Sequence, residues 1–139
     1  MLCGLEIAHE QGLTGHSDAD VATHAVIDAL LGAAGMGDIG TLFPDTDPAF
    51  AGVSSLALLR DVVARLAAAG WLVGNVDLVI VAERPKLAPY RAQMAALLAA
   101  ALGVADDAVG VKATTTEGMG FEGRGEGISA SAVCLLERA

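Results

Sequence analysis

Two kinds of hydrophobic pattern along the chain predict most of its elements. Residues 54–70 and 90–103 are predicted helices, the first starting at Ser54 or Ser55 and the second preceded by Pro89, which suits a first helical turn. Residues 71–82 alternate and are rich in β-branched side chains, which predicts a strand. Residues 109–115 and 128–138 are predicted strands on either side of a glycine-rich loop, and residues 2–7 (LCGLEI) predict a further short strand.

A helix between these segments carries an unusual polar stripe. Ser17 is its predicted N-cap, with Asp20 as the capping-box partner three residues later, and Gly35 is its predicted end. The segment is apolar almost all round, which indicates a helix that is buried on several sides. Asp20, His24 and Asp28 recur at every fourth position, so they share one face of this helix.

The order of elements predicts one α+β domain over residues 1–139, a small mixed sheet with helices packed on one face. Hydrophobic residues make up 54 % of the chain and mean hydropathy is +0.56, yet no apolar run reaches the roughly 20 residues of a membrane helix. We therefore expect no membrane association and a large buried surface, part of it in an oligomer interface.

Charge and cysteine content exclude several functional classes. A net charge of −9 argues against nucleic-acid binding, which needs a basic surface, so a small anion must be held by backbone amides and a few local cations. Cys3 and Cys134 are distant in sequence and form no CxxC motif, so we expect no disulfide framework. No targeting peptide is visible, and we expect a cytoplasmic protein.

Two loops that follow the first helix have more than one interpretation. GMGDIG (35–40) matches the dinucleotide-binding pattern, but it follows a helix and enters a loop, so we interpret it as a loop with positive-φ glycines. FPDTD (43–47) places two carboxylates in a proline-bounded loop. It fits both a surface Asx turn and a set of acceptors for substrate hydroxyls.

The segment KATTTEGMGFEGRGEG (112–127) is the strongest candidate for phosphate chemistry. Hydroxyls and free amides at a strand end can cradle a phosphate, Glu117 can hold Mg²⁺ beside it, and Arg124 supplies a planar donor fork. A tight loop whose glycines serve geometry alone is the alternative. Lys86, between two prolines, is either a solvated lysine or part of a stiff ligand-binding loop, and His24 is either a core histidine or a metal ligand.

HSDADVATH, GDIGTLFPDTDPAF, GNVDLVIVAERPK and KATTTEGMGFEGRGEGI together resemble the 2-C-methyl-D-erythritol 2,4-cyclodiphosphate synthase family, from about Cys3 to the C-terminus. The resemblance implies a homotrimer with active sites between neighbouring subunits. It implies an enzyme, a phosphorus–oxygen lyase of the non-mevalonate isoprenoid pathway. The implied substrate is 4-diphosphocytidyl-2-C-methyl-D-erythritol 2-phosphate, which closes to the cyclic diphosphate and releases CMP.

The resemblance also assigns roles to residues of this chain. His16 and Thr115 are the implied transition-state stabilisers, His24 a ligand of a catalytic Zn²⁺, and Glu117 a ligand of Mg²⁺ or Mn²⁺. The residues that the resemblance places against the substrate are His16, Ser17, Asp38, Ile39, Gly40, Phe43, Pro44, Asp45, Thr46, Asp47, Ala82, Glu83, Arg84, Pro85, Lys86, Leu87, Ala88, Thr114, Thr115, Thr116, Glu117, Phe121 and Arg124.

The other two zinc ligands of the family come from an Asp-x-His motif on an N-terminal strand, and these 139 residues contain no Asp-x-His. Either a natural protein starts further upstream, or a short chain keeps the trimer and the nucleotide pocket without full catalysis. We expect weak or absent cyclase activity from the chain as printed, with Asp20 and Asp28 as the first substitute ligands to test. The alternative functions are a catalytically impaired trimeric cytidine-nucleotide-binding protein and, less favoured, a metal-dependent phosphohydrolase.

Overall fold

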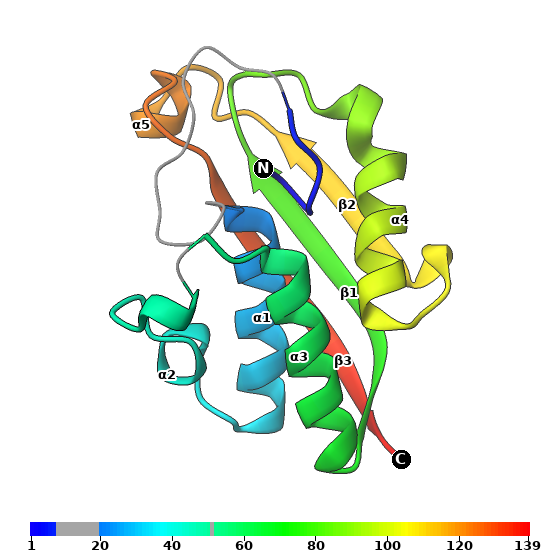
Figure 1. Ribbon diagram of the computed structural model, residues 1–139. Helices are drawn as coiled ribbons and strands as arrows, with labels where there is room; N and C mark the ends of the chain where they lie inside the picture. The colour runs from blue at the N-terminus through cyan, green and yellow to red at the C-terminus, as the bar shows by residue number, and fades with distance from the viewer. Residues whose placement is uncertain (8–19, 51) are drawn as a thin grey trace.

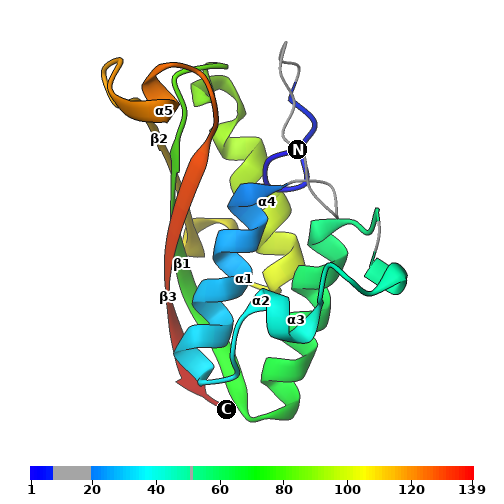
Figure 2. The ribbon, with the colours of Figure 1, turned by 90° about the vertical axis from the view of Figure 1, so that its left-hand side faces the viewer.

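Three helices cover one side of a three-stranded sheet in the computed structural model, which describes residues 1–7, 20–50 and 52–139 (Figures 1 and 2). The helices are α1 (Val21–Ala34), α3 (Ser55–Ala68) and α4 (Arg91–Leu102). The strands are β1 (Trp71–Val81), β2 (Val109–Thr114) and β3 (Ser129–Arg138). The predicted α+β class, the mixed sheet and the single helical layer are confirmed.

The sheet has the order β2-β1-β3, with β1 in the centre. β1 runs parallel to β2 and antiparallel to β3, with a register shift between Val73 and Asn75. The parallel pair is joined by α4, the helical crossover that such a pair requires. The connections also contain two four-residue helices, α2 (Ile39–Leu42) and α5 (Gly120–Gly123), and a 3₁₀ turn at Pro48–Phe50. Two further 3₁₀ turns, Ala88–Tyr90 and Asp106–Ala108, lie within the crossover on either side of α4.

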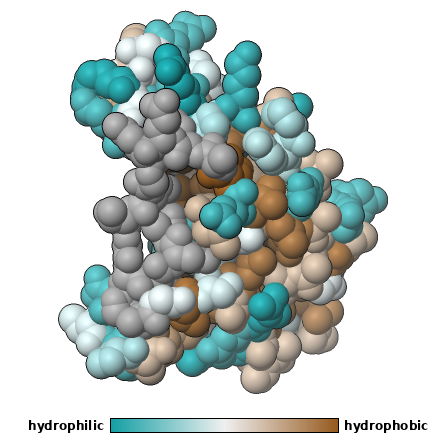
Figure 3. All heavy atoms as spheres, turned by 45° about the horizontal axis from the view of Figure 1, so that its top comes forward, coloured by the Kyte–Doolittle hydropathy of each residue, from teal (hydrophilic) through white to brown (hydrophobic). Residues whose placement is uncertain are grey.

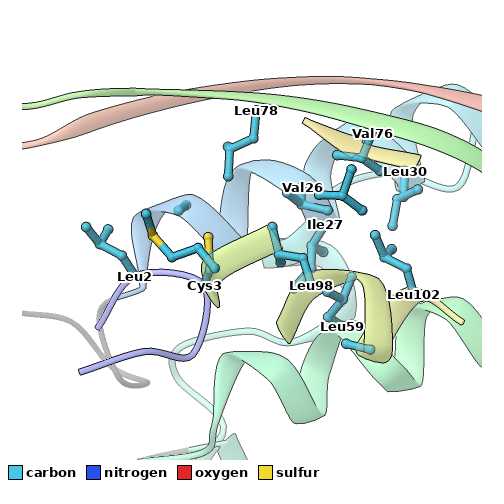
Figure 4. Packing of buried hydrophobic residues seen from close by; sticks show 14 of the residues in the cluster. Leu2, Cys3, Val26, Ile27, Leu30, Leu59, Val76, Leu78, Leu98 and Leu102 are labelled. Atoms are coloured by element: carbon cyan, nitrogen blue, oxygen red, sulfur yellow. The ribbon is translucent and has the colours of Figure 1, made fainter. Parts of the chain in front are cut away.

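The core lies between the sheet and the helices. On β1, the side chains of Val76, Leu78 and Ile80 are buried beneath the helices, and alternate positions point the other way because side chains alternate across a strand. Figure 4 shows Val76 and Leu78 above Val26 and Ile27 of α1, with residues of α3 and α4 completing the cluster.

Apart from the short helix α5 at one edge, the opposite face of the sheet has no helix over it within the described chain (Figure 2). Val133 and Leu135 of β3 are 72 % and 57 % exposed, and Leu72 of β1 is 51 % exposed. On the same face Lys112 Nζ lies 3.0 Å from Asp77 Oδ2. This uncovered face is therefore partly apolar, as the high hydrophobic content of the sequence led us to expect.

Residues 2–7 do not form the predicted strand. Leu2 and Leu5 close a tight turn through a pair of backbone hydrogen bonds of 2.9 Å, and Cys3 and Gly4 have φ of 52° and 76°. The prediction was wrong because these two amides point at a partner distant in sequence. Asp20 Oδ1 accepts from Cys3 N at 2.9 Å, and Asp20 Oδ2 accepts from Gly4 N at 2.6 Å.

The predicted start of the first helix was wrong, because Asp20 and not Ser17 is the N-cap. The Asp20 side chain caps α1, accepting from Thr23 N at 3.0 Å and from Thr23 Oγ1 at 2.7 Å. The predicted N-cap, Ser17, lies outside the described residues. The predicted end is confirmed, because Gly35 closes α1 with φ of 68°. The loop interpretation of GMGDIG is confirmed at Gly35 and Gly37, which have positive φ, whereas Gly40 lies within α2.

Cys3 is predicted to be chemically inert in the folded protein. Both cysteines are free thiols, and Cys3 has no exposed surface. Burial raises the pKa of the Cys3 thiol, and the nearby Asp20 charge raises it further. Because the thiolate is the nucleophile, we expect iodoacetamide at neutral pH to label Cys3 at least about 100-fold more slowly than in denaturant. Peptide mass spectrometry separates Cys3 from Cys134, and equal labelling rates in both conditions would contradict the buried turn.

None of the helices in the described parts of the chain is long and apolar enough to cross a membrane.

Candidate functional site

The two segments with the strongest predicted chemistry leave adjacent strands at the same edge of the sheet. Val81 and Thr114 are register partners at the carboxyl ends of the parallel strands β1 and β2. Beyond them, Ala82 N donates to Thr114 O at 3.0 Å, which continues the pairing into the loops. Residues 82–88 and 114–117, which are distant in sequence, therefore begin side by side.

Internal hydrogen bonds shape the loop that follows β2, residues 114–119. Thr115 Oγ1 accepts from Glu117 N at 3.2 Å, and Thr116 Oγ1 donates to Met119 O. Glu117 has φ of 55°, a conformation that non-glycine residues rarely adopt, and its side chain is exposed. The loop thus holds the Glu117 carboxylate in solvent, immediately after three hydroxyl-bearing residues.

Arg124 faces a carboxylate that the sequence analysis did not single out. Its Nε and Nη2 lie 2.7 and 3.1 Å from Glu126 Oε1 and Oε2, a two-point ion pair. This hydrogen-bonded pairing raises the pKa of Arg124 and lowers the pKa of Glu126, so both groups are charged at neutral pH. Figure 3 shows that hydrophilic side chains gather at the corner of the molecule where the α5 loop lies. No signal in the sequence distinguishes Glu126 from the other loop acids.

The loop from Ala82 to Ala88 separates buried from exposed side chains. Ala82 and Leu87 are buried and attach the loop to the core, whereas Arg84 and Lys86 are exposed. The Arg84–Pro85 peptide bond is cis. Glu83 Oε2 is buried without a hydrogen-bond partner among the described residues. The loop therefore presents two cations in a chain of net charge −9, which suits an anionic ligand.

The segment from Asp38 to Asp47 is built around α2. Asp38 caps this helix, and hydrogen bonds from the side chain and backbone of Thr41 hold the pKa of Asp38 below its usual range. Asp45 and Thr46 are exposed, and Asp47 Oδ1 accepts from Ala49 N at 2.9 Å, the Asx turn that was one of the two interpretations of FPDTD.

Phe43, one of the predicted substrate contacts, is largely buried within this chain. It is 6 % exposed and packs edge-to-face against Phe50, with ring centroids 5.3 Å apart. The guanidinium of Arg65 in α3 lies over the Phe43 ring, with its Cζ atom 5.5 Å from the ring centroid. Phe43 therefore attaches the loop to α3, and Pro44 beside it is half-buried.

His24 is tied to a buried serine of α3. Its Nε2 lies 2.8 Å from Ser55 Oγ, and Ser55 has no exposed surface. The sequence marked Ser55 only as a helix start. Pairing with an imidazole explains why a hydroxyl is tolerated in this buried position, since buried polar groups need hydrogen-bond partners.

Ser55→Ala is expected to lower the free energy of unfolding by about 1 kcal/mol, since it removes the partly buried hydrogen bond with His24. Ser55→Thr keeps the hydroxyl and should recover part of this loss. Urea denaturation measures both values. A Ser55→Ala variant as stable as the parent would mean that the contact with His24 contributes nothing to stability.

The described residues by themselves do not form a zinc site. Residues 1–7, 20–50 and 52–139 contain no group of three His, Cys, Asp or Glu side chains placed to hold a metal ion. Of the two suggested substitute ligands, Asp20 accepts four hydrogen bonds from Cys3, Gly4 and Thr23. Asp28 Oδ1 accepts from Ile39 N at 2.8 Å. His24 is thus one ligand at most, whereas Glu117 alone suits Mg²⁺, which takes few protein carboxylates alongside substrate phosphates.

The predicted site residues fall into two groups of segments, and α2 of the first lies apart from α5 of the second within one chain. His24, α2 and the loop to Asp47 form the first group, and the loops after β1 and β2 together with α5 form the second. In Figures 1 and 2, α2 and α5 lie at well-separated places on the molecule. The remaining predicted residues, His16 and Ser17, lie outside the described part of the chain.

Comparison with known proteins shows the family to which the chain belongs. The YgbB family model matches residues 1–137. A 2-C-methyl-D-erythritol 2,4-cyclodiphosphate synthase of Thiobacillus denitrificans is 63 % identical over 135 residues, which are 97 % of this chain and 84 % of the relative.

Solved structures agree with the sequence relatives. The bifunctional IspDF of Campylobacter jejuni matches with a TM-score of 0.96 and 40 % identity, over 100 % of this chain and 38 % of that protein. A CDP-bound 2C-methyl-D-erythritol-2,4-cyclodiphosphate synthase matches with a TM-score of 0.90 and 40 % identity, over 99 % of this chain and 89 % of the other. The chain therefore belongs to the YgbB family, the family of the 2-C-methyl-D-erythritol 2,4-cyclodiphosphate synthases.

Proposed function

We propose that this protein converts 4-diphosphocytidyl-2-C-methyl-D-erythritol 2-phosphate into 2-C-methyl-D-erythritol 2,4-cyclodiphosphate and CMP. An oxygen of the 2-phosphate attacks the β-phosphorus, and the bond from that phosphorus to the α–β bridging oxygen breaks, so that CMP leaves. This is a phosphorus–oxygen lyase reaction. The observation that carries the proposal is the hydrogen-bonded junction of Ala82 and Thr114, which places a cationic loop beside a hydroxyl-rich one.

The chain's own residues act by positioning and by charge stabilisation, which supply most of the catalysis in phosphoryl transfer. The loop from Ala82 to Ala88 binds the cytidine end, and Lys86 meets the phosphates. Residues 114–117 contact the diphosphate, and Thr115 acts with His16 to stabilise charge in the transition state. Phe121 and Arg124 complete the contacts, with Arg124 shared between the substrate and Glu126.

Two metals belong to the proposal in different ways. Glu117 would hold Mg²⁺ or Mn²⁺, which neutralises diphosphate charge when bound. His24 would supply one ligand to Zn²⁺, and Ser55, which lies 2.8 Å from its Nε2, would help to orient the ring. Since the described residues do not complete a zinc site, we assign no step to that metal.

We also propose that the active site lies between subunits of a homotrimer. α2 of the first group and α5 of the second lie apart within one chain, so a site that uses both groups takes one from each of two copies. The uncovered sheet face, with Val133 and Leu135 exposed, offers an apolar surface for such contacts.

CMP release tests the reaction. The 139-residue chain, supplied with Zn²⁺ and Mg²⁺, should release little CMP, and the same chain extended by an Asp-x-His strand from a relative should release CMP together with the cyclic diphosphate. Binding of CDP by both forms without CMP release from either would favour the impaired nucleotide-binding protein. Release of inorganic phosphate would favour a phosphohydrolase.

Mixing two inactive variants tests the shared site. His24→Ala and Thr115→Val, both in the extended chain, remove one residue from each group. If sites are shared, co-assembled trimers hold about a quarter of their sites with both groups intact, and activity returns to a comparable fraction. No recovery after verified subunit exchange would place each site within one chain.

A further inference from the structure

Two carboxylates from different parts of the chain hold the start of α2. Asp38 Oδ1 accepts from Thr41 N and Thr41 Oγ1, both at 2.8 Å. Asp28 Oδ1, which belongs to α1, accepts from Ile39 N at 2.8 Å. The first-turn amides of a helix have no partner within the helix, so each carboxylate satisfies a donor that otherwise depends on water.

A four-residue helix cannot sustain itself, because fixing the first turn costs more than its single hydrogen bond returns. The C-terminal end of α2 is attached to the core through Phe43, whose N donates to Ile39 O at 2.8 Å and whose ring is buried. The N-terminal end of α2 is attached to α1 through Asp28. This residue sits one position after Ile27, which has no exposed surface, so its backbone is rigidly attached to the core.

We propose that Asp28 is a positioning residue, which sets the place of Asp38, Ile39 and Gly40 relative to α1 and so shapes the pocket wall that they form. The inference rests on the proposed function in so far as this segment meets the substrate. Asp28 itself touches only the Ile39 amide in this role. It acts on substrate binding through the segment, so its loss should raise KM more than it lowers kcat.

Hydrogen exchange and kinetics together test the role. In Asp28→Ala the Ile39 amide should exchange at least about tenfold faster, and KM for the diphosphocytidyl substrate should rise by a similar factor, since the lost bond has a charged acceptor. Asp28→Asn keeps an acceptor oxygen and should stay close to the parent in both measurements. Asp107→Ala removes the same charge from an exposed site distant in the sequence and should change neither.

The exchange arm uses NMR on the 139-residue chain and needs no activity, whereas KM is measured on the extended chain. Unchanged Ile39 exchange in Asp28→Ala overturns the proposal whatever the enzyme does. Faster exchange with unchanged KM also overturns it, because the contact then orders the segment without serving substrate binding. An inactive parent would count against the proposed function alone and leave the exchange result standing.

Discussion

Asp20→Asn should lower the free energy of unfolding by roughly 3 kcal/mol or more, the largest stability effect that we expect from a single polar substitution here. The carboxylate has no exposed surface and accepts four hydrogen bonds from Cys3, Gly4 and Thr23. An asparagine turns an NH₂ group toward some of these donors. Buried N–H groups are then left without partners while the side chain keeps almost the same shape.

Chemical denaturation measures the global loss, and Cys3 provides a local readout. In Asp20→Asn the turn at residues 2–5 loses its anchor, so Cys3 should become accessible to iodoacetamide under native conditions. Asp107→Asn is the matched control, since it makes the same change at an exposed carboxylate. A loss below about 1 kcal/mol would show that the four contacts contribute far less than buried charge-assisted hydrogen bonds usually do.

Gly123→Ala should reduce kcat/KM of the extended chain by on the order of 100-fold, because catalytic groups displaced by about 1 Å lose that much. A Cβ at this position would lie 2.2 Å from the carbonyl carbon of Gly118 and 2.6 Å from its oxygen. The three nearest atoms all belong to the backbone of Gly118, so no flexible side chain can move aside. The loop must open, carrying Glu117, Phe121 and Arg124 away from their places.

Stability should respond much less than activity, since the loop is exposed and packs little of the core. Gly32→Ala is the control with the opposite sign, because Gly32 lies in α1 with nothing within 4 Å of its added Cβ. It should raise the free energy of unfolding by up to about 1 kcal/mol without altering kcat/KM. A Gly123→Ala variant with near-parental kcat/KM and CDP affinity would mean that the loop relaxes without moving its functional groups.

Local patterns were sufficient for most of the fold. Alternation over 71–82 predicted β1, and its buried positions Val76, Leu78 and Ile80 are the alternate residues that such a pattern requires. The end of α1 at Gly35 was equally local, because a left-handed residue there is favoured by glycine itself. The candidate site residues, in contrast, came from the resemblance of whole motifs to a family rather than from periodicity.

The errors share one physical cause. LCGLEI has the composition of a strand, yet the carboxylate of Asp20 draws the Cys3 and Gly4 amides into a turn. The same carboxylate caps α1 and makes Asp20, rather than Ser17, the start of the helix. Hydrogen bonds between residues about 16 positions apart have no signature in a local pattern.

By itself, the sequence determined the α+β class, three strands, three long helices and the family, because periodicity, glycine position and long motifs are all written locally. Only the tertiary structure decided which groups meet. It joined Ala82 to Thr114, His24 to Ser55, Asp28 to Ile39 and Arg124 to Glu126. It also separated the site residues into two groups within one chain. Most of these contacts depend on strand register and helix packing, which arise from the burial of the whole core rather than from any single segment.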